Sequence, residues 1–185
     1  VLEEKAGLES ALIPSGHMVV HGRLQSKFHE AGWLSDKMEG IDFLFFLREL
    51  AEMIENDWAS VLADLESVRD LLVNQNTLLF NITCEADAWR MIRPQLAELA
   101  SALPKNAVNT AAWSPEFGNE PEGLTIPAQV NYVGKGANLY YLGYELSGTI
   151  GAITRYLGMT WLWEKVRVQG GAYGGFSVFD MKSGL

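Results

Sequence analysis

Cysteine is nearly absent from this chain of 185 residues, since Cys84 is its single example. One cysteine cannot close an internal disulfide, which excludes a small secreted scaffold held together by disulfide bonds. Long apolar runs are absent as well. The longest, Ile41 to Leu47, is interrupted by Asp42 and falls far short of the ~18 residues of a membrane span. The sequence therefore predicts neither a disulfide framework nor a membrane partner.

Basic residues are scarce too: 14 Lys and Arg stand against 23 Asp and Glu, for a net charge of −9. The imbalance lies in residues 1–104, which carry 17 acidic and 8 basic side chains, whereas residues 105–185 carry 6 of each. A nucleic-acid-binding protein needs a basic surface to displace counterions, so we expect no nucleic-acid partner. An acidic surface attracts basic peptides, but a solvated helix face has the same composition, so charge alone leaves both interpretations open.

The chain does have strong helical periodicity, with apolar residues at three- and four-residue spacing. Helices are predicted over 1–12, 17–31, 41–55, 58–73, 85–103 and 145–166. Short runs rich in apolar and β-branched residues instead predict strands over 77–85, 126–136 and 172–180. Together these patterns predict an α+β fold in which helices pack on mixed β-sheets.

Residues 104–125 break the periodicity. They contain three prolines, two glycines and three asparagines, a composition typical of a connection between domains at this length. We therefore predict one domain over 1–103, a linker over 104–125 and a second domain over 126–185. Because the chain starts inside a helical pattern and stops after a turn-like Lys-Ser-Gly, we expect two partial domains of a longer protein.

Two histidines, His17 and His21, stand one helical turn apart, a spacing that can bind zinc. The zinc-peptidase motifs also need a glutamate, at position 18 or at position 20, and the chain has Met18 and Val20 there. Without that carboxylate nothing nearby activates a water molecule. We expect no metal site within these residues.

The stretch WEKVRVQGGAYGGF, residues 163–176, holds four glycines within six residues. It fails the dinucleotide pattern at Ala172 and the phosphate-loop pattern at Phe176, and it lies between a helix and a strand in the wrong order for either. Two interpretations remain open. The glycines can simply end a helix and allow close backbone approach. Alternatively, Arg167 and Tyr173 can donate hydrogen bonds to a peptide carbonyl, with glycines beside them that leave room for the substrate.

The same stretch resembles a known family. Residues 161–176, WLWEKVRVQGGAYGGF, resemble the WLW(D/E)(K/R)VRVxGGAYGGF segment of presequence proteases, the peptide-degrading branch of the pitrilysin and insulin-degrading-enzyme superfamily. Residues 126–135, IPAQVNYVGK, resemble the IPTQVNYVGK segment of that family, and Tyr144 to Leu146 match the GYEL that follows it.

The resemblance implies pitrilysin-like metallohydrolase domains from the C-terminal half of a zinc metalloendopeptidase. Residues 1–103 would end the third domain and 126–185 would begin the fourth. Arg167 and Tyr173 match the family's catalytic and substrate-binding arginine and tyrosine, and Gly170 and Gly171 lie at the substrate backbone. Zinc would be bound outside this chain, in the N-terminal half of the same protein, so these residues alone are expected to be inactive.

The implied substrates are unfolded peptides such as cleaved targeting presequences, and the implied partner is the N-terminal half. The implied compartment is intracellular: the mitochondrial matrix or plastid stroma in a eukaryote, and the cytoplasm in a bacterium. An alternative is a non-catalytic pitrilysin-like scaffold or partner subunit, which retains the fold without the zinc motif.

Overall fold

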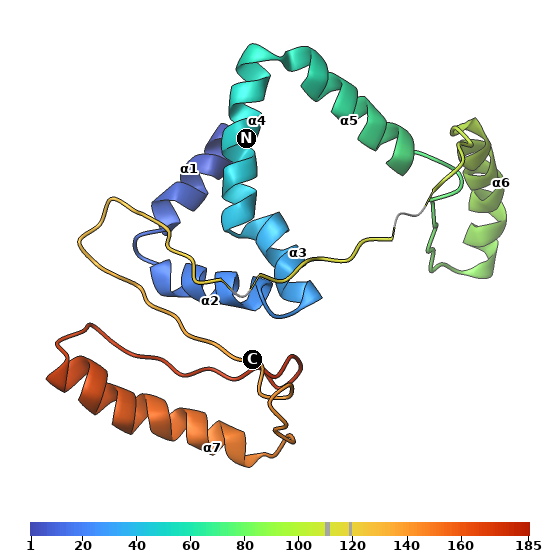
Figure 1. The fold of residues 1–185 in the computed structure, drawn as a ribbon. Coiled ribbons are helices and arrows are strands. Elements are labelled where there is room, and N and C mark those ends of the chain that lie inside the picture. The colour runs from blue at the N-terminus through green and yellow to red at the C-terminus, as the bar shows by residue number, and fades with distance from the viewer. Residues whose placement is uncertain (110–111, 119) are drawn as a thin grey trace. The chain divides into compact units, whose positions relative to one another are not determined.

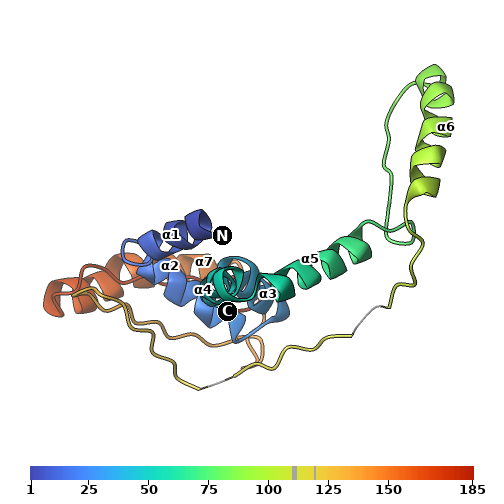
Figure 2. The same ribbon diagram turned by 90° about the horizontal axis from the view of Figure 1, so that it is seen from above.

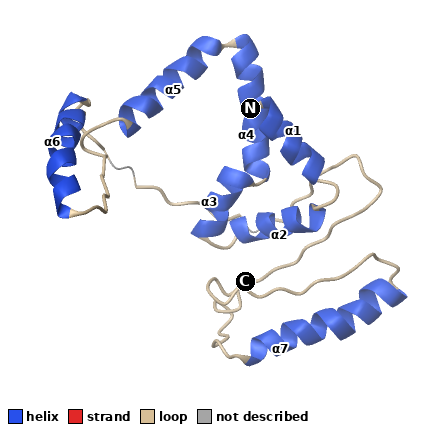
Figure 3. Ribbon diagram, turned by 180° about the vertical axis from the view of Figure 1, so that it is seen from behind, coloured by secondary structure: helices blue, strands red, loops and turns tan. Residues whose placement is uncertain are grey.

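The computed structural model describes residues 1–109, 112–118 and 120–185, which form two compact units. One unit comprises Val1–Leu2 and Leu47–Ser114, and the other comprises Glu3–Phe46 and Pro115–Leu185. The domain division expected from the sequence stays a prediction. The described residues form seven α-helices and two π-helices. In chain order they are α1 (Leu2–Ala11), α2 (Gly16–Ser26), α3 (Glu30–Glu39), α4 (Ile41–Asn56), α5 (Trp58–Leu72), α6 (Ala86–Ala102), α7 (Thr149–Tyr156), η1 (Leu157–Trp161) and η2 (Trp163–Gln169). The α-helices are labelled in Figures 1 and 3.

Helical periodicity located most of these elements correctly. The helices predicted over 1–12, 41–55, 58–73 and 85–103 are confirmed within one or two residues at each end. The helix predicted over 17–31 is instead α2, which stops at Ser26, followed by a separate helix α3. α3 starts anew after His29, because the Nδ1 of His29 accepts a hydrogen bond of 2.9 Å from the Gly32 amide and so caps the first turn of α3.

The expected α+β fold is wrong. Among the described residues the structure contains helices, turns and extended segments but no strand (Figure 3). The segments 77–85, 126–136 and 172–180 carry the apolar, β-branched composition of strands, yet none of them pairs with another in a ladder. Several of their apolar side chains are accordingly open to solvent, at 88% for Leu79 and 92% for Val133. Composition favours an extended backbone, but only a paired neighbour makes it a strand.

The segment 126–136 packs against a helix instead of another strand. The hydroxyl of Tyr132 donates to the carbonyl oxygen of Ile13, just before α2. A Cβ at Gly134 would clash with side-chain atoms of Val20 and Leu24, so the absent side chain allows the segment to approach α2 closely. The family-like IPAQVNYVGK motif therefore lies along α2.

In the first unit, α5 and α6 are joined by a turn and by the extended segment 77–85, which runs beside α6 (Figures 1 and 2). Asn74, which is fully buried, anchors the turn. Its side-chain amide donates to the Asn106 carbonyl at 3.1 Å, and its side-chain oxygen accepts from the Asn106 amide at 3.2 Å. These bonds hold together the two ends of the segment that contains 77–85 and α6.

A similar tie holds the second unit together. The Leu139 amide donates to the Gly184 carbonyl at 2.8 Å, and the buried Asn138 side chain donates to the Ser183 carbonyl at 2.9 Å. The Tyr140 hydroxyl donates to the Met181 carbonyl at 2.6 Å. These bonds join the residues before and after the long helix α7–η2, so the chain that leaves along the helix must return beside it.

Candidate active-site segment

The candidate site lies at the end of the long helix that begins with α7. Ile150 is buried and starts the apolar face of α7. Backbone dihedrals stay helical through Leu157 and Leu162, so α7, η1 and η2 form one continuous rod whose last two sections are π-helical. The predicted helix over 145–166 therefore begins four residues later and runs three residues further. A π-helix closes each backbone hydrogen bond over one more residue than an α-helix, and it is frequent at functional sites.

Gly170 and Gly171 end this helix. The Gly171 amide donates to the Arg167 carbonyl at 3.0 Å, and the Ala172 amide donates to the Val166 carbonyl at 3.1 Å. Gly171 has φ +72°, the left-handed conformation that glycine adopts without strain. A Cβ at Gly170 would lie 2.6 Å from the Val166 carbonyl oxygen, whereas a Cβ at Gly171 would meet nothing within 4 Å. The tight helix end is therefore sufficient reason for a glycine at position 170. At position 171 the space beside the backbone is empty, so a ligand can approach it.

After this turn the chain runs back alongside the helix (Figure 1). A Cβ at Gly175 would lie 3.3 Å from the Leu162 Cβ and 3.5 Å from the Val166 Cβ, so the returning backbone packs directly on the helix. This close approach positions Tyr173 beside the last turn. The Arg167 Cζ lies 5.9 Å from the centroid of the Tyr173 ring. The structure therefore brings together the two residues that the sequence singled out.

Both side chains are available to a ligand. Tyr173 is 96% exposed, and within the described residues its hydroxyl has no hydrogen-bond partner. Arg167 forms no ion pair with a described carboxylate; instead its Cζ lies 4.4 Å from the ring centroid of Trp163. A guanidinium carries five donors and a phenol carries one, so the pair can donate several hydrogen bonds to one or two carbonyl oxygens. Their catalytic role stays a prediction, as does the substrate contact of Gly170 and Gly171.

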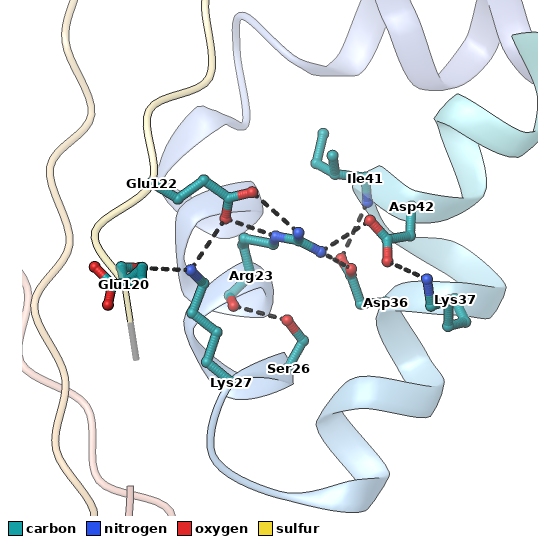
Figure 4. A network of polar contacts seen from close by, with 9 residues as sticks. All are labelled: Arg23, Ser26, Lys27, Asp36, Lys37, Ile41, Asp42, Glu120 and Glu122. Carbon is teal, nitrogen blue, oxygen red and sulfur yellow. Dashed lines mark hydrogen bonds and ion pairs between the residues drawn. The ribbon is translucent and has the colours of Figure 1, made fainter. Parts of the chain in front are cut away.

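A second polar centre, which the sequence reasoning missed, surrounds Arg23 of α2 (Figure 4). Its Nη1 bonds Asp36 of α3 and Asp42 of α4, and its Nε and Nη2 form a two-pronged pair with Glu122 at 2.8 and 3.0 Å. Lys27 adds a contact to the same Glu122 carboxylate at 3.5 Å. The partners stand up to 99 residues apart, so no local spacing could have revealed this network.

The network shifts the pKa values of its members. The hydrogen bond from Arg23 lowers the pKa of Glu122, although burial acts in the opposite direction. The same hydrogen bond, together with the charges of Asp36 and Asp42, raises the pKa of Arg23. Arg23 thus stays charged under all ordinary conditions, and the network depends on its carboxylates.

The histidine pair does not form a metal site in the described residues. His17 stacks on Phe176 with ring centroids 5.5 Å apart, while His21 faces a cavity of about 360 Å³ among α1 to α4. Within residues 1–109, 112–118 and 120–185 no three His, Cys, Asp or Glu side chains gather in a group that could hold a metal ion.

No helix within the described residues combines the length and the apolar character needed to cross a bilayer.

Two family models match the chain. The model described as the PreP C-terminal domain matches residues 121–185, which include the candidate site. A second model, described as a region associated with peptidases of family M16, subfamily C, matches residues 1–50. Each model covers a part of the second unit that contributes to the Arg23 network. The second description names a class of peptidases.

Similar curated proteins cover the whole length of the chain. It is 37% identical over 186 aligned positions to presequence protease 1, chloroplastic/mitochondrial, of Arabidopsis thaliana, and 31% identical over 184 to Protein HypA of Clostridium perfringens. The mitochondrial presequence protease of Saccharomyces cerevisiae is 22% identical over 187 positions that cover 95% of the chain. The chain spans only 17 to 19% of the length of these relatives. These matches support the identification of the chain as a fragment of a presequence protease, as the resemblance of residues 126–176 implied.

Proposed function

We propose that this chain supplies the substrate-contacting part of a zinc metalloendopeptidase that degrades unfolded peptides. Arg167 and Tyr173 carry this role, and the zinc ion and the general base lie in other parts of the full-length protein. The observation that supports the proposal most directly is the pairing of these two side chains at one helix end, 5.9 Å apart, with Tyr173 96% exposed.

The two side chains act on the carbonyl of the peptide bond under attack. The guanidinium and the phenol each donate a hydrogen bond toward the oxygen, and these bonds strengthen as negative charge develops on it. Because Arg167 is held by aromatic rings and not by a described carboxylate, its positive charge is not neutralised before substrate arrives. The exposed backbone at Gly171 leaves space for an extended peptide.

Zinc, when bound, would polarise the same carbonyl and activate a water molecule. The described residues offer no donor set for that ion. The proposal therefore assigns to this chain only binding, orientation and charge stabilisation, and it makes the N-terminal half of the protein the necessary partner.

The proposed substrates are short unfolded chains such as cleaved targeting presequences. The names of the Arabidopsis and yeast relatives support this substrate class, and they also support the mitochondrial matrix or plastid stroma as the compartment in a eukaryote. For a bacterial protein of this kind, the proposed compartment is the cytoplasm. Peptides of this class are basic, which suits the acidic side chains of residues 1–104.

The test is kinetic and uses the full-length protein. Arg167→Ala and Tyr173→Phe are each expected to lower kcat/KM on a quenched fluorescent peptide by about 10²-fold or more, the loss typical of a deleted oxyanion donor. Arg155→Ala and Tyr141→Phe are matched controls, because both side chains are exposed and neither has a side-chain partner in the described residues. Wild-type kinetics in both site variants, with zinc content unchanged, would refute these roles. A wild-type protein without peptidase activity would favour the scaffold alternative.

A further inference from the structure

Trp163 lies at the centre of the candidate site without belonging to any core. Its side chain is 49% exposed, and the Arg167 Cζ lies 4.4 Å from its ring centroid. That distance is well inside the ~6 Å within which a cation is attracted to an aromatic face. The same guanidinium is 5.9 Å from the Tyr173 ring, so Trp163 is the closer of its two aromatic neighbours.

Stacking on an indole uses the flat face of the guanidinium and leaves its in-plane N–H groups free. An exposed arginine otherwise samples many rotamers, and ordering it on substrate binding costs free energy. A ring that already holds the guanidinium removes part of that cost. Trp163 thus restricts Arg167 without occupying the donors that a peptide carbonyl needs.

The π-helical backbone separates Arg167 from a competing carboxylate. Residues four apart, such as Trp163 and Arg167, lie on the same face of an α-helix and of a π-helix alike. Glu164 and Arg167, three apart, would be neighbours in an α-helix, but the wider turn of η2 moves them onto different faces. In η2 the Glu164 carboxylate instead accepts a hydrogen bond of 2.9 Å from Gln169, which in turn accepts one of 3.0 Å from Lys165. The Glu164 carboxylate, the nearest to Arg167 in sequence, is therefore bonded to Gln169 and not to Arg167.

From this geometry we propose that Trp163 is a positioning residue that orients Arg167 for peptide binding and hydrolysis. The inference rests on the proposed function of Arg167 and extends it by one residue. Trp163 acts through Arg167 and not by direct contact with the peptide, so its effect must vanish when Arg167 is absent.

The experiment is a double-mutant cycle in the full-length protein, read as kcat/KM on a fluorescent peptide. Trp163→Leu is expected to lower kcat/KM about two- to fivefold, the range that exposed cation–π pairs give. Trp163→Phe, which keeps an aromatic face, should recover most of the loss. Trp161→Leu is the matched control: its side chain is 54% exposed and makes no cation–π contact in the described residues, so it should match wild type.

The decisive comparison is Trp163→Leu in the Arg167→Ala background, where it is expected to have no further effect. An equal loss in both backgrounds, or wild-type kinetics for Trp163→Leu beside a slow Arg167→Ala, overturns the positioning role and leaves the proposed function standing. Wild-type kinetics for Arg167→Ala refute both. If turnover by Arg167→Ala is too slow to measure, the same cycle is read as the dissociation constant of a fluorescein-labelled peptide in the presence of EDTA.

Discussion

The pair between Glu122 and Arg23 gives the most quantitative prediction about this fold. Glu122→Gln keeps the shape of the side chain and removes its charge. Exposed ion pairs contribute about 0.2–1 kcal/mol. This pair is two-pronged, with side chains only 28% and 23% exposed, so we expect the upper end, about 1 kcal/mol. Removing Arg23 costs more, because it leaves Asp36, 4% exposed, without its cation; Arg23→Met should cost about 3 kcal/mol.

Hydrogen exchange on the full-length protein measures these costs where they arise. Glu122→Gln should speed exchange of the hydrogen-bonded amides of α2, against which the segment 120–136 packs, about fivefold, the equivalent of about 1 kcal/mol in local opening. Arg23→Met should speed exchange of the same amides more than about a hundredfold, and it should also speed exchange of the α3 amides. Arg69→Met is the matched control, since it removes an arginine from an ion pair in which both side chains are more than half exposed.

The pH dependence of the Glu122 effect has a definite sign. Because the folded-state pKa of Glu122 is lowered, its ionised form stabilises the fold above the unfolded pKa, and that contribution is lost as pH falls through the folded pKa. The difference between wild type and Glu122→Gln should therefore be full at pH 7 and should shrink below about pH 4.3, the ordinary glutamate value. The reasoning is refuted if the stability difference between wild type and Glu122→Gln stays constant down to about pH 3.5, well below that value. It is also refuted if Arg23→Met and Arg69→Met have equal effects on exchange.

Three further predictions concern close contacts. Asn74→Ala should destabilise the turn that holds 74–77 to 103–106 by about 1–3 kcal/mol, because it removes both hydrogen bonds between the buried Asn74 side chain and the Asn106 backbone; hydrogen exchange in the first unit measures it. Gly134→Ala should speed exchange in α2, because its Cβ would clash with Val20, whereas Gly123→Ala, with nothing within 4 Å, should not. Gly171→Ala should cost about 1–2 kcal/mol at the helix end through its φ of +72°, visible as faster exchange in η2.

Local patterns predicted the helices well because helices are local structures. The periodicity that identified α4 and α5 gave their bounds, and Leu47 and Val61 of those apolar stripes are buried, although Leu65 and Leu72 of α5 are exposed. The strand predictions failed for the opposite reason. Segments such as 77–85 show the composition of a strand, but a strand depends on a distant partner that composition cannot supply.

The candidate site was partly predictable. Arg167 and Tyr173 were identified from a motif, and the structure places them together at one helix end. The contribution of Trp163 was not predicted, although it stands four residues before Arg167, a spacing that makes two side chains neighbours on any helix and could have revealed the contact. The Arg23 network was invisible for a different reason: its partners Asp36, Asp42 and Glu122 are separated by up to 99 residues.

The two interpretations of the glycine-rich stretch, a helix end or a peptide-binding site, prove to be compatible. Gly171 adopts a left-handed conformation that stops the helix, and Gly175 lets the returning chain pack on Leu162 and Val166. Those same two features carry Tyr173 back to the last turn, within 5.9 Å of Arg167. A Cβ at position 175 would already touch Leu162 and Val166, so glycine allows the closest approach of the returning segment to the helix. The structural role of the glycines is therefore the reason that the two candidate site residues meet.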